Sequence, residues 1–120
     1  MKKILVVEDN PINMKLFCDI LEVNNYDVEK ATDGLEALDR MKNRKYDLVV
    51  LDIQLPKMDG FSVLEKLKEE ERRIPKVVVA SAFAMDKDKQ KAKMLGCVDY
   101  ITKPIDIFNF LNTIKNLLGE

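Results

Sequence analysis

The sequence predicts an α/β domain in which five strands alternate with five helices, building a parallel sheet covered by helices on both faces. Three short, unbroken apolar runs at 4–7, 48–51 and 77–80 are typical of strands buried on both faces of such a sheet. Between these runs, apolar residues recur at helical spacing. Because strands that alternate with helices pack through right-handed crossovers, this order predicts a doubly wound sheet.

The first two strand–helix units are marked by clear helix starts. Asn10-Pro11 follows strand 4–7 and provides a capping residue with proline at the first helical position. Segment 26–31 is a more polar strand, which places it near an edge of the sheet, and Asp33-Gly34 begins the next helix. The expected apolar stripes of these helices are Met14, Phe17, Cys18 and Leu21 in the first, and Leu35, Leu38 and Met41 in the second.

The remaining three units follow the same pattern. Segment 47–60, DLVVLDIQLPKMDG, is a buried strand followed by a turn, after which a third helix begins. After strand 77–80 we expect a highly charged helix over about 85–95. A fifth strand around 100–101 leads to a last helix capped by Asp106. The expected stripes are Phe61, Leu64 and Leu67 in the third helix, and Ile107, Leu111, Ile114 and Leu118 in the last.

Length and composition narrow the class of protein. The chain of 120 residues has the size of one domain, and we expect a single domain over 1–120 with no attached output domain. A net charge of −1 does not mark the surface for nucleic acid or membrane binding. There is no apolar run of membrane length, and Cys18 and Cys97 lack paired spacing, so we expect a cytoplasmic protein with free core thiols. The absence of histidine excludes Ser-His, Cys-His and zinc-histidine chemistry.

Polar residues stand where the buried strands end. Glu8 and Asp9 follow the first strand, Asp52 the third and Ser81 the fourth, and Lys103 follows the fifth. The carboxyl ends of parallel strands meet at one edge of the sheet, so these side chains are expected to converge. Three carboxylates together repel one another unless a hard divalent cation such as Mg²⁺ lies among them. Because a carboxylate can accept a phosphoryl group directly, Asp52 on the central strand is the candidate nucleophile.

Each of these residues also has a simpler interpretation. Glu8 and Asp9 could only favour the positive end of the following helix. Asp52 could simply end its strand, Ser81 could be a turn hydroxyl, and Lys103 could be a solvated loop lysine. The occurrence of all of them at successive strand ends favours the functional interpretation.

The chain resembles the receiver domain of two-component response regulators from its first strand to its last helix. The matching segments are VVEDN at 6–10, DLVVLDIQLPKMDG at 47–60, VVVASAFA at 77–84 and DYITKPI at 99–105. The sequence around these segments is similar to stand-alone cell-division and cell-fate receivers and to the receivers of hybrid kinases.

This resemblance implies a role for each acidic residue of the cluster. Asp52 corresponds to the phosphoacceptor, and Glu8 with Asp9 to the acid pair that holds Mg²⁺. Asp52 and the backbone carbonyl of Gln54 would supply further metal ligands.

The resemblance also implies the switch residues and the topology. Ser81 corresponds to the hydroxyl that follows the phosphoryl group, Lys103 to the lysine that bridges to it, and Tyr100 to the aromatic switch residue. From its residue type alone, Tyr100 could equally be an amphipathic surface tyrosine. The implied fold is flavodoxin-like or CheY-like, with a sheet of strand order 2-1-3-4-5. The resemblance also implies a cis peptide bond at Lys103-Pro104.

The function that the resemblance implies is a phosphorylation-dependent signalling switch. A sensor histidine kinase or a phosphotransfer protein would donate the phosphoryl group, and the face made by the fourth helix, fifth strand and fifth helix would bind a downstream protein. The expected protein is a monomer or weak dimer that does not bind nucleic acid directly. It is not an enzyme beyond its own phosphorylation and slow autodephosphorylation. Alternatively, it passes phosphate along a phosphorelay or belongs to a hybrid kinase.

Three other classes remain as alternatives. A flavin-binding module of the same fold would need hydrogen-bond donors after the first strand, where Glu8 and Asp9 place negative charge. A Mg²⁺-dependent phosphatase with an aspartyl nucleophile usually has a second acid two residues later, where this chain has Gln54. A scaffold with a degenerate site is disfavoured because all five polar positions are intact.

Overall fold

The computed structural model describes residues 1–83 and 85–120 and places them in alternating strands and helices. Ala84, the last residue of the segment 77–84, lies outside the described residues. The strands are β1 (Lys3–Val7), β2 (Asp27–Ala31), β3 (Leu48–Leu51), β4 (Val77–Ser81) and β5 (Asp99–Thr102). The helices are α1 (Pro11–Val23), α2 (Gly34–Asn43), α3 (Gly60–Glu69), α4 (Asp86–Met94) and α5 (Ile107–Leu117).

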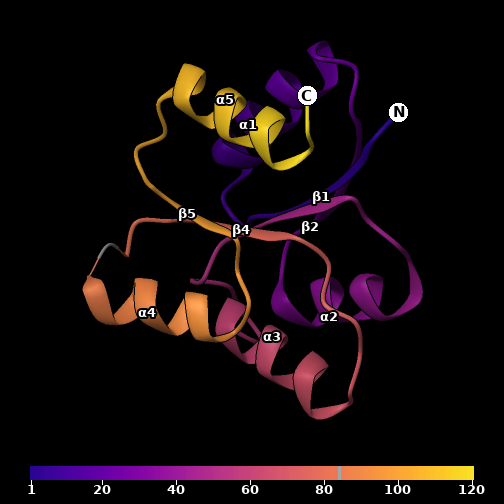
Figure 1. The fold of residues 1–120 in the computed structure, drawn as a ribbon, viewed down its shortest axis with the longest axis vertical. Coiled ribbons are helices and arrows are strands. Elements are labelled where there is room, and N and C mark those ends of the chain that lie inside the picture. Colours follow the sequence, from indigo (N-terminus) through magenta and orange to yellow (C-terminus); the bar gives the residue numbers. More distant parts are fainter. Residues whose placement is uncertain (84) are drawn as a thin grey trace.

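The strands form one parallel sheet in the order β2-β1-β3-β4-β5. Figure 1 shows this sheet on edge, with α1 and α5 on one side and α2, α3 and α4 on the other. The more polar β2 lies at an edge, as its composition predicted, and β3 lies in the centre. The predicted fold class and strand order are therefore confirmed.

Hydrophobic cores cover both faces of the sheet. Successive residues of a strand point to opposite faces. In β3, Leu48 and Val50 accordingly face one core, whereas Val49 and Leu51 face the other. The unbroken apolar runs are therefore buried on both sides, as predicted. In the core beneath α1 and α5, the rings of Phe17 and Phe110 lie 5.1 Å apart.

The predicted helical stripes need two corrections. Leu35 is 50% exposed and Ile107 is 46% exposed, so neither belongs to the core. Both lie in the first turn of their helices, and neither belongs to the hydrophobic clusters that contain Leu38 and Ile114. The other members of the two stripes are buried or half-buried, and Phe110 completes the inner face of α5 with 0% exposure.

Local capping also agrees with the sequence. The side chains of Asn10, Asp33 and Asp106 accept hydrogen bonds from backbone N–H groups in the first turns of α1, α2 and α5. Such bonds satisfy donors that a helix start otherwise leaves unpaired. The Lys103–Pro104 peptide bond is cis, as the resemblance implied.

Both cysteines are free thiols, as predicted, but only Cys18 is fully buried and Cys97 is half-buried. Burial raises the pKa of the Cys97 thiol to about 11. Among residues 1–83 and 85–120, no helix has the length and apolar character needed to cross a membrane.

Candidate metal centre at the carboxyl edge of the sheet

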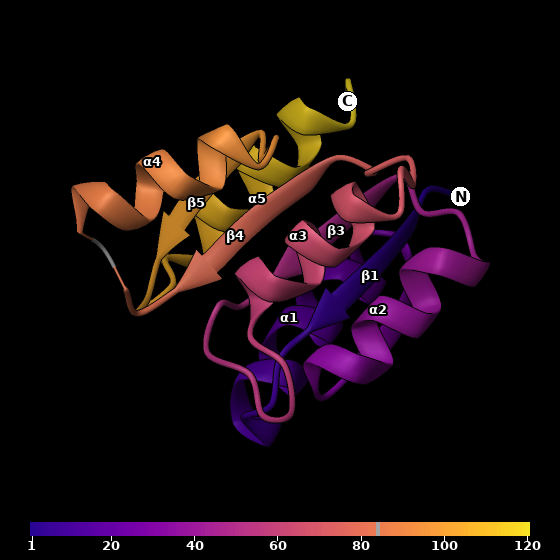
Figure 2. The same ribbon diagram turned by 90° about the horizontal axis from the view of Figure 1, so that it is seen from below.

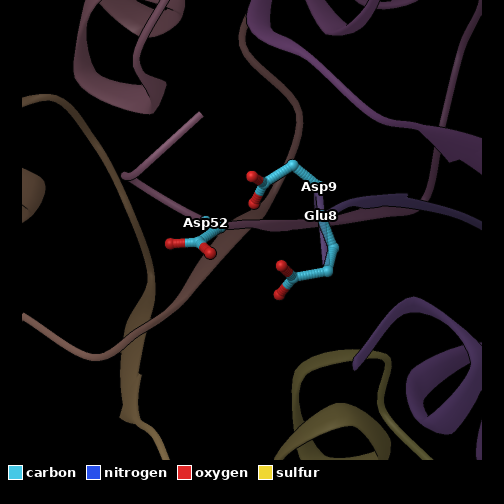
Figure 3. Close-up of side chains that lie close together, drawn as sticks. All are labelled: Glu8, Asp9 and Asp52. Carbon is cyan, nitrogen blue, oxygen red and sulfur yellow. The ribbon is translucent and has the colours of Figure 1, made fainter. Parts of the chain in front are cut away.

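Three carboxylates converge where β1 and β3 end. Val7 pairs with Leu51 in the sheet, so the next residues, Glu8 and Asp52, leave the sheet side by side. Carboxylate oxygens of Glu8, Asp9 and Asp52 lie within 4.8 Å of one another. Figure 3 shows the three side chains gathered in one place. The convergence predicted from the strand ends is therefore found in the structure.

The backbone holds two of these carboxylates in place. Glu8 accepts a hydrogen bond of 3.0 Å from the backbone N–H of Asn10. Asp52 accepts one of 3.1 Å from the backbone N–H of Gln54, and its own N–H donates to the carbonyl of Val7 at 3.1 Å. Both side chains are nearly inaccessible, at 1% exposure for Glu8 and 5% for Asp52, whereas Asp9 is exposed.

Lys103 lies between the two buried carboxylates. Its ammonium nitrogen is 2.5 Å from Glu8 Oε1 and 2.7 Å from Asp52 Oδ2. Burial lowers the pKa of Lys103, but its hydrogen bonds to Asp52 and Glu8 outweigh this effect, so the pKa is raised and the lysine is charged. Burial raises the pKa of Glu8, although the Lys103 and Asn10 hydrogen bonds act in the opposite direction.

The donor set fits a hard divalent cation. The three carboxylates of the cluster face a single ammonium, which leaves two negative charges in excess. In residues 1–83 and 85–120 the carboxylate of Asp9 has no hydrogen-bond or ion-pair partner. Mg²⁺ favours a site with a few carboxylate oxygens and open positions for water or phosphate oxygen. Charge, ligand type and exposure therefore all agree with a magnesium site.

Two glycines let the turn after Asp52 pack closely. A Cβ on Gly60 would lie 2.4 Å from the carbonyl oxygen of Asp52, and one on Gly34 would lie 1.7 Å from that of Met58. The N–H groups of Gly60 and Gly34 donate to the carbonyls of Ile53 and Pro56, at 2.8 and 3.2 Å. The segment 53–59 is thus held at both ends. Sequence reasoning missed this role, although the Asp-Gly pairs at 33–34 and 59–60 were its signal.

Ser81 and Tyr100 both bond to Phe83. The Oγ of Ser81, which is 0% exposed, accepts a hydrogen bond of 3.2 Å from the N–H of Phe83. The hydroxyl of Tyr100 donates to the carbonyl of Phe83 at 2.5 Å. Lys103 joins the same region, because its N–H donates to the carbonyl of Ser81 at 2.8 Å. Residues 81–83 therefore connect β4 with β5 and, through Lys103, with the acidic cluster. The sequence did not predict this connecting role of Phe83.

A groove leads from the acidic cluster toward α4. It has a volume of ≈ 620 Å³ and its lining includes Asp9, Gln54, Phe83 and Lys91. Phe83 is 41% exposed in this groove. The pKa of the neighbouring Tyr100 is raised, mainly because its hydroxyl is partly buried. The cluster is thus reachable from outside on the side where Asp9 is exposed.

Comparison with known proteins identifies relatives over the whole chain. A family model described as response regulator receiver domain matches residues 4–115. The polar-differentiation response regulator DivK of Brucella anthropi is 43% identical over 121 residues, covering 99% of this chain and 98% of that protein. DivK of Brucella ovis is 44% identical with the same coverage. The similarity to cell-fate receivers indicated by the sequence is confirmed.

Solved structures of similar proteins have the same fold. A CheY-like receiver domain protein of Methanospirillum hungatei JF-1 is 31% identical, with a TM-score of 0.90, over 99% of this chain and 94% of that one. The receiver domain of the sensor histidine kinase PA1611 of Pseudomonas aeruginosa PAO1 is 28% identical, with a TM-score of 0.87, over 99% and 98% of the two chains. That structure has a magnesium ion coordinated in its active-site cleft.

Proposed function

The chain belongs to the response regulator receiver domain family, and from this premise we propose that it is a phosphorylation-dependent switch with Asp52 as the phosphoacceptor. As a member of that family it is a signalling protein of two-component systems and not a classical enzyme. The observation that carries the proposal is the position of Asp52. Its carboxylate ends the central strand, 2.7 Å from the Lys103 ammonium and within a cluster of three acids.

The proposed donor is a phosphohistidine on a sensor histidine kinase or a phosphotransfer protein. A carboxylate oxygen of Asp52 attacks phosphorus, forming a P–O bond while the P–N bond to the donor histidine breaks and its electron pair leaves with the ring nitrogen. Glu8, Asp9, Asp52 and the Gln54 carbonyl would hold Mg²⁺, which when bound supplies positive charge opposite the phosphoryl oxygens. Lys103 lies beside the attacking carboxylate and provides further positive charge.

The same contacts suggest how phosphorylation reaches the surface. A phosphoryl group on Asp52 offers a new acceptor to the hydroxyl of Ser81, whose Oγ bonds to the Phe83 N–H in this structure. Movement of Ser81 would release Phe83, and with it the hydrogen bond that holds the Tyr100 hydroxyl. Such a switch requires that the phosphoryl group stabilises one arrangement more than the other.

The proposed output is contact with a downstream protein through the face made by α4, β5 and α5. Several large apolar side chains are exposed there, with Met94 at 79% and Phe108 at 81%. A face that exposes several large apolar side chains can serve as a protein–protein contact site.

A role as a phosphate shuttle in a phosphorelay is the second candidate. It is supported by the similarity to receiver domains of histidine kinases, such as those of Pseudomonas aeruginosa and Syntrophus aciditrophicus. Return of the phosphoryl group from the phosphorylated chain to a phosphotransfer protein would distinguish this function. A flavin-binding function is disfavoured, because the buried carboxylates of Glu8 and Asp52 would repel a flavin phosphate.

The direct test is the intact mass of the protein after incubation with acetyl phosphate, with Mg²⁺ or with EDTA. We expect one added phosphoryl group in the wild type with Mg²⁺, and none in Asp52→Asn. Asp59→Asn is the matched control, because it makes the same change in the same connection and asparagine caps a helix as well as aspartate. Phosphorylation of Asp52→Asn, or phosphorylation that does not require Mg²⁺, would refute the proposed site.

A further inference from the structure

A cationic groove lies at the edge of the sheet opposite the acidic cluster. It is lined by residues 2–3, 41–47, 72–76 and Leu118, and has a volume of ≈ 860 Å³. These residues come from the start of β1, from the α2–β3 and α3–β4 connections, and from the end of α5. Figure 2 shows the arrowheads of β1 and β4 pointing away from these connections. The groove and the acidic cluster are thus separated by the length of the strands.

Positive charge is concentrated in this groove. Eight of the 20 lysines and arginines of the chain line it, but Asp47 is its single acidic residue among the 21 of the chain. The net charge of −1 conceals this asymmetry, because the other acidic residues of the chain do not line the groove. A concave surface lined by charges of one sign focuses its field and attracts ions of the opposite sign.

Acids within the protein neutralise only part of this charge. Three of the lining cations, Lys3, Lys42 and Arg44, form ion pairs with acidic side chains outside the groove. The ammonium of Lys76 donates instead to the carbonyl of Leu117 at 2.8 Å. Four more lining cations have no ion-pair partner in the described part of the chain, namely Lys2, Lys45, Arg72 and Arg73.

We propose that the cationic groove binds a small ligand that carries two or more linked phosphate groups. Arg72 and Arg73 present planar guanidinium groups, which match phosphate oxygens with two parallel hydrogen bonds. Lys45 and Lys76, which also line the groove, add point charges. A single phosphate would use only some of these donors, whereas a chain of phosphates would engage cations from both connections.

The shape of the groove favours a small ligand over an extended polymer or a membrane. Its volume of ≈ 860 Å³ lies within the range of about 300–1,000 Å³ that is usual for small-molecule sites. A nucleic acid would need a longer cationic track, with about 1,000–2,500 Å² of buried protein surface. The half-buried Ile74 and Pro75, which follow Arg73 in the chain, also line the groove and offer apolar surface against which the base of a nucleotide can pack.

Titration calorimetry in EDTA at about 0.15 M salt tests the proposal, because EDTA keeps metal–phosphate complexes away from the acidic cluster. Tripolyphosphate and ATP are the two probes. We expect one site per chain, and affinity reduced about tenfold or more in Arg72→Gln/Arg73→Gln because charge-assisted hydrogen bonds are lost. Both arginines are exposed, so the variant should fold normally. Lys87→Gln/Lys93→Gln, with the same charge change on exposed positions of α4, is the matched control and should bind like the wild type.

Amide chemical shifts identify the place of binding. Either probe should shift the amides of 44–47 and 72–76, and leave those of 8–10 and 52–54 unchanged. Asp52→Asn should bind as the wild type does, so this result is independent of the proposed phosphorylation. Tighter binding of ATP than of tripolyphosphate would indicate a nucleotide, and equal binding would indicate a polyphosphate chain.

Several results would overturn the proposal. These are the absence of binding by both probes, and an equal loss of affinity in the α4 control, which would show unspecific attraction. Binding of anionic vesicles or of a single-stranded oligonucleotide by the same arginines, with neither small probe bound, would assign the groove to a membrane or to nucleic acid.

Discussion

Replacement of Lys103 by glutamine should destabilise the metal-free protein strongly. The Lys103 ammonium is the one positive charge in contact with both buried carboxylates in the described structure, at 2.5 Å from Glu8 and 2.7 Å from Asp52. Glutamine retains a hydrogen-bond donor but removes that charge. Glu8 and Asp52, at 1% and 5% exposure, would then face each other and Asp9 without compensation.

The size of the effect is limited by protonation of a carboxylate. Removing one partner of a buried ion pair costs about 3–5 kcal/mol, because the remaining charge is left unpaired. At neutral pH the variant can relieve the repulsion by protonating Glu8, whose pKa burial already raises. Protonation of Glu8 relieves part of the repulsion, so the loss should lie at the lower end of the range of about 3–5 kcal/mol. We therefore expect a loss of about 3 kcal/mol in the free energy of unfolding.

Urea denaturation in EDTA, followed by circular dichroism, measures this loss. Lys15→Gln is the control, since the Lys15–Asp19 pair has a similar distance of 2.8 Å but side chains that are 78% and 59% exposed, and its removal should change stability little. Added Mg²⁺ should stabilise Lys103→Gln more than the wild type, because the cation replaces the missing charge. A metal-free variant as stable as the wild type would refute the idea that Lys103 compensates the acidic cluster.

Two further substitutions test the contacts around the site and at the edge of the sheet. Gly60→Ala should lower the free energy of unfolding by about 2 kcal/mol, because its Cβ would lie 2.4 Å from the Asp52 carbonyl oxygen and the backbone must move. Glu29→Gln should cost about 1.5 kcal/mol at pH 7, since it removes the charge that accepts hydrogen bonds from Tyr46 at 2.7 Å and from Arg44 at 2.8 Å. The Tyr46 hydrogen bond is the main cause that lowers the pKa of Glu29 in the folded state, so this contribution is complete above about pH 4.5 and is lost as pH falls through the lowered pKa.

Chemical denaturation measures both changes, with pH varied from about 7 to 3 for the second. Gly119→Ala is the comparison for Gly60, because no atom lies within 4 Å of the added Cβ there and only the positive φ of 75° opposes the change. Glu36→Gln is the comparison for Glu29, since its contact with Arg40 is 3.8 Å long and its side chain is 40% exposed. Equal effects within either pair would contradict the contact assigned to Gly60 or Glu29.

Much of this fold follows from local features of the sequence. Caps such as Asn10 and Asp33 bond to neighbours two or three residues away, so local residue types are enough to predict them. Strand 48–51 is unbroken in its apolar character because both of its faces are buried, which also indicates a parallel sheet. The acidic cluster was predictable for a related reason, since the carboxyl ends of parallel strands always meet at one edge.

Other features depend on contacts that local pattern does not contain. Leu35 and Ile107 fit their helical stripes, but whether they are buried depends on which distant parts of the chain pack against the first turn of each helix. The need for glycine at position 60 arises from the Asp52 carbonyl, eight positions earlier in the chain, which the folded turn brings against it.

The amino acid sequence by itself determined the type of each element, the order of the sheet through its resemblance to receivers, and the residues of the acidic cluster. Only the tertiary structure decided that Lys103 bridges Glu8 and Asp52, and that Phe83 joins Ser81 to Tyr100. The cationic groove likewise exists only in the folded chain, because its residues come from four separate segments. The reason is physical: loops at the amino edge of the sheet carry no shared motif, so their charges add only where the packed strands bring those loops together.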